Sequence, residues 1–173
     1  MIQLKNILIP TDFSNNNQSA LQYGCDLARR FGSELHLIHI VEPSGGLVPL
    51  PDLPDDVALD LQNSSPIARA ELRLKSLPSR EVQQKLTVHR HTDIGKPSVE
   101  IMRYARTHHI DLIVIGTHGH TGWEHLLLGS VAERIVQKSP CPVLTIRPQE
   151  QLPQQIDVSK AETAQDSSSV KPS

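Results

Sequence analysis

The sequence has few aromatic residues, few cysteines, no long apolar run and no excess of positive charge. Aromatic side chains make up only 3% of the 173 residues, while 38% of all residues are hydrophobic. The core must therefore be built from Ile, Leu, Val and Ala, a composition that suits a buried parallel sheet covered by helices. A chain of this length fits one domain with a real core and a tail besides.

These absences exclude several classes of function. A net charge of -2 leaves no cationic excess to neutralise a nucleic acid, so we expect no nucleic-acid partner. Cys25 and Cys141 lie far apart in sequence and form no disulfide framework, which fits a reducing cytosol. No apolar run approaches the ~20 residues of a membrane span, and the N-terminus enters a strand pattern without a charged leader. We therefore expect a cytoplasmic protein without a membrane span.

Short apolar runs alternate with segments of helical spacing. Strands are expected at residues 7–9, 35–41, 86–88, 112–115 and 142–146, and helices between 14 and 32, over 66–77, over 97–105 and over 131–136. Residues 42–65, which contain four prolines, form a long irregular connection. This alternation predicts a single α/β domain over 1–148, with an open, doubly wound parallel sheet and helices on both faces. Residues 149–173 are polar and without a useful period, so we expect a disordered tail there.

Three local predictions follow from the same patterns. The Ser14 hydroxyl is expected to cap the first helix by accepting from a backbone N–H group, and Gly32 is expected to end that helix. On the third helix, Val99 and Met102 are expected on the inner side together with Ala105.

The most distinctive stretch lies between the fourth strand and the fourth helix. Four glycines, Gly116, Gly119, Gly122 and Gly129, precede Ser130 within fifteen residues. Glycine-rich backbone at the start of a helix presents N–H groups without side-chain bulk, which makes a natural anion site. We infer that this stretch holds the phosphates of a nucleotide, assisted by the Ser130 hydroxyl.

A second turn at the end of a strand complements the glycine stretch. In an open α/β sheet, ligands bind beyond the carboxyl ends of the strands where the strand order reverses. Pro10, Thr11 and Asp12 follow the first strand, and Ile115 ends the fourth. The Asp12 carboxylate suits ribose hydroxyls, and main-chain groups near Ile40 suit the border of a base. Two alternatives stay open: Asp12 as a mere helix-entry residue that assists Ser14, and the glycine stretch as an unoccupied turn.

The same residues carry a family resemblance. The segment 10–14, His39 with Ile40, and the pattern G-x-x-G-x(9)-G-S over 116–130 resemble the universal stress protein family, and the glycine spacing matches its ATP-binding branch. The similarity extends to residues 139–147, so it covers roughly residues 3 to 148. The resemblance implies strand order 3-2-1-4-5 in a Rossmann-like sheet of the adenine nucleotide alpha hydrolase type. It also implies a homodimer that pairs through the strand Val143–Ile146.

The resemblance further implies which residues contact ATP, in a family that acts in stress response. The ATP contacts that it implies are Asp12, Ile40, Gly116, Gly119, Gly129, Ser130 and Val131. Pro10, Thr11, Ile115, His118 and His120 border these positions and complete the predicted nucleotide site.

One departure from the family pattern affects the predicted chemistry. Family members often place Arg directly after the second glycine, where this chain has His120, and no Lys or Arg occurs between Arg106 and Arg134. The phosphates must then be met by backbone N–H groups, the Ser130 hydroxyl, a Mg or Mn ion, or His118 and His120. A histidine there predicts tighter binding as pH falls toward ~6.5.

The sequence therefore predicts an ATP-binding, homodimeric regulator of stress response with an unidentified protein partner. A phosphate-binding lysine and a recognisable catalytic base are both missing, so at most slow hydrolysis is expected. The alternative is an interaction module that binds no nucleotide and acts through its dimer surface and the 43–65 loop. A nucleotide-transferring enzyme is the third class. No protein metal site is expected, because His118, His120 and His125 have no cysteine nearby, and the alternating His89 and His91 are expected to be exposed.

Overall fold

Five parallel strands form one sheet in the computed structural model, which describes residues 3–43, 65–117 and 128–147. The strand order is β3-β2-β1-β4-β5, as the family resemblance implied. The strands are β1 (Asn6–Pro10), β2 (Glu34–Val41), β3 (Val88–Ile94), β4 (Leu112–Gly116) and β5 (Val143–Ile146). Because β1 pairs with both β2 and β4, it lies at the centre of the sheet.

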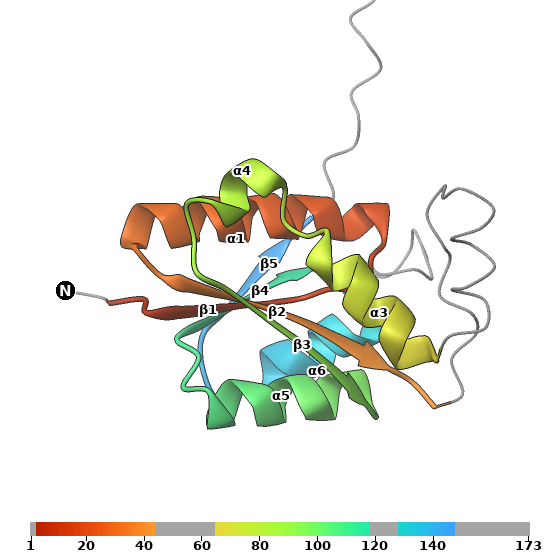
Figure 1. The fold of residues 1–173 in the computed structure, drawn as a ribbon. Coiled ribbons are helices and arrows are strands. Elements are labelled where there is room, and N and C mark those ends of the chain that lie inside the picture. The colour runs from red at the N-terminus through yellow and green to blue at the C-terminus, as the bar shows by residue number, and fades with distance from the viewer. Residues whose placement is uncertain (1–2, 44–64, 118–127, 148–173) are drawn as a thin grey trace, which may run out of the picture.

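Helices cover both faces of the sheet (Figure 1). On one face lie α1 (Gln18–Phe31), α3 (Pro66–Lys75) and the short α4 (Arg80–Gln83), and on the other lie α5 (Pro97–Thr107) and α6 (Ser130–Lys138). A 3-10 turn, η1 (Asn15–Asn17), leads from β1 into α1. This layered arrangement is the predicted open, doubly wound α/β fold.

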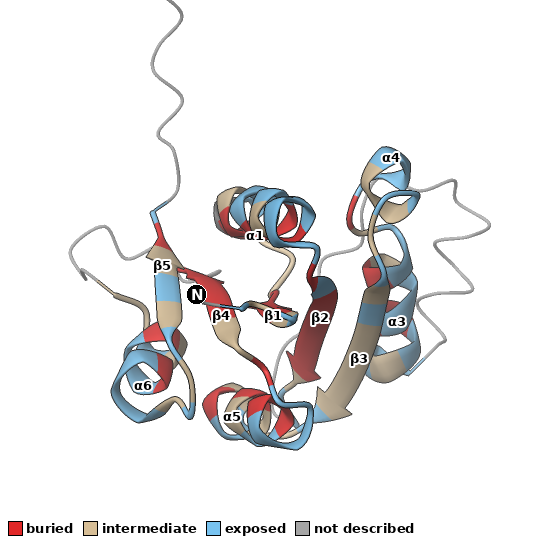
Figure 2. Ribbon diagram, turned by 90° about the vertical axis from the view of Figure 1, so that its left-hand side faces the viewer, coloured by how far each residue is buried: buried red, intermediate tan, exposed pale blue. Residues whose placement is uncertain are grey.

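The central strand is buried on both faces. Ile7 and Ile9 pack into the cluster beneath α1 and α3, while Leu8 packs into the cluster above α5 and α6, and all three are fully buried. Figure 2 shows burial concentrated in β1, β2 and β4. A strand covered on both faces needs apolar residues at successive positions, which is why the sequence shows continuous apolar runs there.

The third strand begins and ends later than predicted. The sequence placed it at 86–88, whereas β3 runs from Val88 to Ile94. β3 is an edge strand whose polar side chains are half-buried or exposed, so it lacks the apolar run that marks the inner strands. His89 is exposed as predicted, and His91 is half-buried.

The inner face of α5 is also different from the prediction. Its buried residues are Ser98, Ile101, Tyr104 and Ala105. Val99 is 48% exposed, so placing it on the inner side was wrong. Ile101, Tyr104 and Ala105 follow the helical i, i+3, i+4 spacing, and Val99 falls outside that stripe.

The two ends of α1 give one correction and one confirmation. Ser14 precedes η1, and its hydroxyl donates to the Asp12 carboxylate at 2.7 Å rather than capping a helix. The prediction of a Ser14 cap was therefore wrong. Gly32 ends α1 in the left-handed conformation with φ 68°, as predicted, because glycine adopts this conformation without steric cost.

Several predictions fall on residues outside the described ones, namely most of the 43–65 loop, residues 118–127 and the tail.

Cys25 and Cys141 are both free thiols, as expected. Among the described helices, none combines the length and apolar character that a membrane crossing requires.

Candidate functional site

The carboxyl ends of β1 and β4 meet at one edge of the sheet, because these strands are parallel neighbours. The chain leaves β1 toward α1 on one face and reaches α6 on the opposite face after β4 (Figure 1). The strand order thus reverses between β1 and β4, and η1 contacts β4. This is the topological switch point at which open α/β sheets bind their ligands.

The Asp12 turn is held by hydrogen bonds at the end of β1. Thr11 N–H donates to the Ile38 carbonyl at 2.8 Å, and Phe13 N–H donates to Thr11 Oγ1 at 3.1 Å. Asp12 Oδ1 accepts from the backbone N–H and the hydroxyl of Ser14, at 2.9 and 2.7 Å. Phe13 has φ 62°, so the chain reverses sharply at this residue. The turn therefore holds a half-buried carboxylate at the edge of the sheet.

A second set of contacts braces this turn from β2 and α3. His39 Nδ1 lies 2.8 Å from the Thr11 carbonyl, so this nitrogen carries the hydrogen and donates. The His39 ring packs 4.4 Å from the Phe13 ring. On the other side, the Arg73 guanidinium lies 4.3 Å above the Phe13 ring, and its Nη2 donates to the Phe13 carbonyl at 3.4 Å.

Arg73 contributes to the Asp12 turn, and the sequence analysis did not predict this. Burial lowers the pKa of its guanidinium, and the charge of Asp12 acts in the opposite direction, which shows that the two groups attract each other. The sequence showed no cation near the glycine stretch, but α3 brings this one to the Asp12 turn from sixty residues away. Nothing in the spacing of α3 distinguishes Arg73 from a solvent-exposed arginine.

The two ends of the glycine stretch are joined by one hydrogen bond. Gly129 N–H donates to the Thr117 carbonyl at 2.7 Å, and Thr117 N–H donates to the Ile146 carbonyl at 2.9 Å. Gly116 is the buried last residue of β4. His118, Gly119 and His120 lie outside the described residues. Thr117 and Gly129, at the two ends of the stretch, are thus held next to each other and to the end of β5.

The helix after the glycine stretch, α6, begins at Ser130. If Ser130 were the N-cap, the helix would begin one residue later, at Val131. Gly129 is the N-cap residue of α6, with φ -65° and ψ 152°, and as a glycine it has no side chain with which to cap the helix. Ser130 is the first helical residue and is exposed, so its hydroxyl does not act as the cap. A helix start with glycine at the N-cap presents its first N–H groups and a partial positive charge.

The other predicted site residues lie at the same edge but are largely buried. Pro10 and Thr11 are buried at the end of β1. Ile40 and Ile115 belong to the core cluster over α5 and α6, and Val131 packs against it. The side chains of these last three residues are committed to packing, so only their main-chain groups are suited to a ligand.

The fold and the residues at the carboxyl ends of β1 and β4 define the class of protein. It is an open, doubly wound α/β domain with a helix start and a carboxylate at its topological switch point. The model of the universal stress protein family matches residues 3–147. The chain belongs to that family.

Individual relatives agree with this assignment. The chain is 34% identical over 143 residues to universal stress protein MJ0531 of Methanocaldococcus jannaschii, covering 83% of this chain and 82% of the relative. Universal stress protein UspA from Lactobacillus plantarum superposes with a TM-score of 0.66 at 28% identity, covering 85% of this chain and all of that one. A universal stress protein in complex with cAMP gives a TM-score of 0.58 at 20% identity, covering 85% and 99%, which is a likeness of fold alone.

Proposed function

We propose that this universal stress protein binds ATP at the carboxyl ends of β1 and β4 and acts as a nucleotide-dependent regulator. The observation that carries the proposal is the hydrogen bond from Gly129 N–H to the Thr117 carbonyl. It joins Thr117 to Gly129 and so brings the start of α6, with glycine at its N-cap, beside the end of β4. We propose that the phosphates of ATP bind at this helix start and that Mg²⁺ or Mn²⁺ supplies further positive charge.

The Asp12 turn would hold the other part of the nucleotide. A carboxylate offers about four lone-pair positions, so accepting two hydrogen bonds from Ser14 does not exhaust its capacity. Two vicinal ribose hydroxyls are donors of the kind that a carboxylate accepts. The other nucleotide-binding residues that we propose are Pro10, Thr11, Ile40, Ile115, Gly116, His118, Gly119, His120, Gly129, Ser130 and Val131.

The described part of the site favours holding ATP over hydrolysing it quickly. Arg73 is the cation at the Asp12 turn, and its guanidinium is engaged with Phe13. Neither a lysine at the phosphates nor a base for an attacking water is among the described residues at this edge. Phosphoryl transfer depends on such groups to stabilise charge and orient the nucleophile. We therefore propose a binding and regulatory role in the cytoplasm, with at most slow turnover.

Calorimetry with ATP and Mg²⁺ on the dialysed full chain tests this proposal. Asp12→Asn keeps an oxygen that can accept from Ser14 but removes the charge that would bind ribose. We expect affinity for ATP to fall by about ten- to hundredfold, as for the loss of a hydrogen bond to a charged group. Asp26→Asn is the control, because it removes the same charge from an exposed position on α1 and should leave affinity unchanged.

Three outcomes would contradict the proposal. Equal affinity in Asp12→Asn and the wild type would exclude the ribose contact. No heat and no co-purified nucleotide in the wild type would favour the alternative, an interaction module that works through its dimer surface and the 43–65 loop. Affinity that stays flat between about pH 8 and 6 would exclude His118 and His120 from the phosphates.

We also propose that two chains pair through β5. This strand is one edge of the sheet, and Leu144 on it is 36% exposed. An exposed edge strand with an apolar side chain is suited to pairing with a second copy. Leu144→Lys should convert a dimer into a monomer in sedimentation or light-scattering measurements, and a wild-type monomer would overturn this part of the proposal.

A further inference from the structure

Three metal-binding side chains gather at the amino-terminal end of β2 and β3. Glu34 and His36 are alternate residues on β2 and therefore share a face of the sheet, and His89 pairs with His36 in the strand register. His89 Nε2 lies 2.7 Å from Glu34 Oε2, and the rings of His36 and His89 stack at 4.6 Å. One ligand atom from each of the three side chains lies within 4.8 Å of the other two.

The buried member of this group has a ring nitrogen that no described residue engages in a hydrogen bond. His36 is only 5% exposed, and its Nδ1 lies 3.0 Å from the Tyr104 hydroxyl. Its Nε2 is buried and makes no hydrogen bond to any of the residues that the structure describes. Leaving a buried polar atom unsatisfied costs about 1–3 kcal/mol. Histidines that bind metals commonly engage the other ring nitrogen in such a hydrogen bond, which fixes the ring and the tautomer.

We propose that Glu34, His36 and His89 bind a divalent transition metal ion of the zinc type. The ligand atoms are a Glu34 carboxylate oxygen and the Nε2 atoms of both histidines, and a water molecule completes the coordination. Two imidazoles and one carboxylate favour Zn²⁺, Co²⁺, Ni²⁺ or Cu²⁺ over Mg²⁺ and Ca²⁺, which prefer oxygen ligands. Donors at 2.0–2.1 Å in tetrahedral geometry are roughly 3.3 Å apart. The half-exposed side chains of Glu34 and His89 must therefore turn toward His36 Nε2 to enclose the ion, and the His89 ring must leave its stacked position on His36.

The hydrogen-bond partner of His36 suits a metal ion on the other ring nitrogen. With the metal on Nε2, Nδ1 carries the hydrogen and donates to the Tyr104 hydroxyl oxygen, 3.0 Å away.

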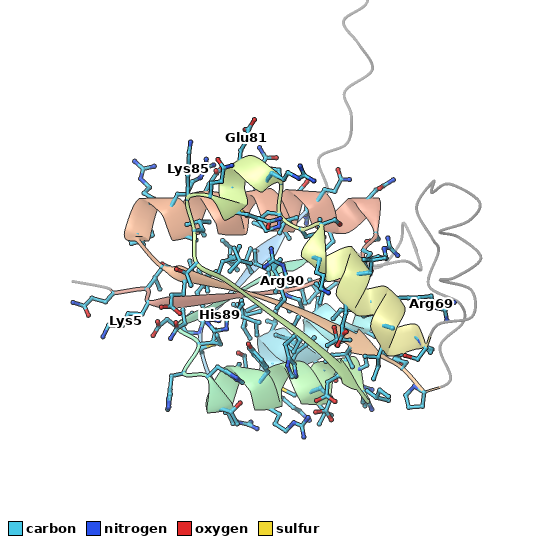
Figure 3. All side chains as sticks on the ribbon, viewed as in Figure 1. Lys5, Arg69, Glu81, Lys85, His89 and Arg90 are labelled. Carbon is cyan, nitrogen blue, oxygen red and sulfur yellow. The ribbon has the colours of Figure 1, made fainter. Side chains whose placement is uncertain are left out.

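This site is separate from the one proposed for ATP. Glu34 begins β2 and His89 is the second residue of β3, whereas the Asp12 turn and α6 lie where the strands end. In the view of Figure 3, Lys5 and His89 are both labelled toward the end where β1 begins, and Arg69 is labelled at the opposite end. A failure of ATP binding therefore leaves the metal proposal untouched. Sequence reasoning predicted no protein metal site, because it considered only His118, His120 and His125. The pairing of His36 with His89 is a property of the strand register and is not visible in the sequence.

Titration of the chelator-treated full chain with ZnCl₂, without nucleotide, tests the proposal. We expect one equivalent of Zn²⁺ per chain in calorimetry and a visible Co²⁺ spectrum typical of four-coordinate cobalt. Glu34→Gln and His89→Gln each remove one ligand from a half-exposed side chain, 53% and 46% exposed, so the fold should survive both changes. Since loss of an outer partner alone costs about 10–100-fold, each change should weaken binding by about a hundredfold or more.

His91→Gln is the matched control, because His91 lies two residues further along the same face of β3 and is not part of the group of three. It should retain the stoichiometry and the affinity of the wild type. Wild-type affinity in both ligand variants would overturn the proposal, and so would an equal loss in His91→Gln. A stoichiometry of one ion per two chains would also overturn it, since the ion would then be shared between copies.

Discussion

The two ends of this sheet are suited to ions of opposite charge through different kinds of groups. At the carboxyl end, the groups suited to phosphate are main-chain N–H groups at the start of α6, which any helix following a parallel strand presents. At the amino end, the groups suited to a metal ion are three side chains that the strand register brings together. The first site thus follows mainly from the fold, and the second depends on the identity of three residues.

The largest expected effect is a loss of overall stability, which would weaken both proposed sites together. Ile113 is fully buried in β4 between β1 and β5, so Ile113→Ala should lower the free energy of unfolding by about 2–5 kcal/mol. Urea denaturation of the protein without metal or nucleotide measures it. Leu72→Ala is the control, because Leu72 is 43% exposed and its loss should change stability by about 0.5 kcal/mol or less. Equal effects of the two changes would contradict the buried position of Ile113.

Acid should destabilise the metal-free protein through His36, at the amino end of the sheet. Burial lowers the folded pKa of His36 to about 4, below its ordinary value of 6.5, so between these values the unfolded chain binds the extra proton. This histidine is neutral in both states above pH 6.5. As pH falls from 6.5 to 4, it should destabilise the metal-free protein by up to roughly 3 kcal/mol.

Urea denaturation of the metal-free chain across this range measures the effect, with His36→Gln for comparison. The variant should lose the part of the slope between pH 6.5 and 4 that His36 contributes. Identical slopes in the two proteins would show that the pKa of His36 is not lowered.

Removing one hydroxyl should change the affinity for metal at the amino end and leave the affinity for ATP at the carboxyl end unchanged. Tyr104→Phe deletes the partner of His36 Nδ1 and should weaken Zn²⁺ binding by about 10–100-fold, while ATP affinity stays the same. Calorimetry with each ligand in turn measures this. Tyr23→Phe removes the same group from a side chain that is 48% exposed on α1 and should change neither affinity. Parallel losses of both ligands in Tyr104→Phe would indicate a general structural defect instead.

The smallest expected effect lies at the carboxyl end. Arg73→Gln removes the guanidinium above Phe13, which braces the Asp12 turn, and should weaken ATP binding by about two- to fivefold. Zn²⁺ affinity should not change. Lys75→Gln removes the same charge from an exposed position on the same helix and serves as the control. A larger loss in Lys75→Gln than in Arg73→Gln would contradict the bracing role.

The sequence was most informative where strands are buried on both faces. The apolar runs of β1, β2 and β4 and the glycine after α1 were recognisable because burial and backbone conformation dictate these residue types locally. β3 was placed too early because an edge strand with His89, Arg90 and Asp93 has no apolar run. The strand order came from the family resemblance and is confirmed by the structure.

The sites were predictable only where their residues are close in sequence. The Asp12 turn and the glycine stretch are local patterns, and the sequence showed that each follows a strand. Arg73 and the pair of His36 and His89 depend on contacts between distant segments. No local period in the sequence indicates the register between strands that lie more than fifty residues apart, so the cluster of Glu34, His36 and His89 became visible only in the structure.

The positions of β3 and β5 decide how assembly would relate to metal binding. They are opposite edges of one sheet, so a dimer that pairs through β5 would join two sheets into one and leave both copies of β3 at its outer rims. The two metal ions would then be as far apart as the combined sheet allows, each held within a single chain. Pairing and metal uptake would therefore be independent events, and adding Zn²⁺ should leave the ratio of dimer to monomer unchanged.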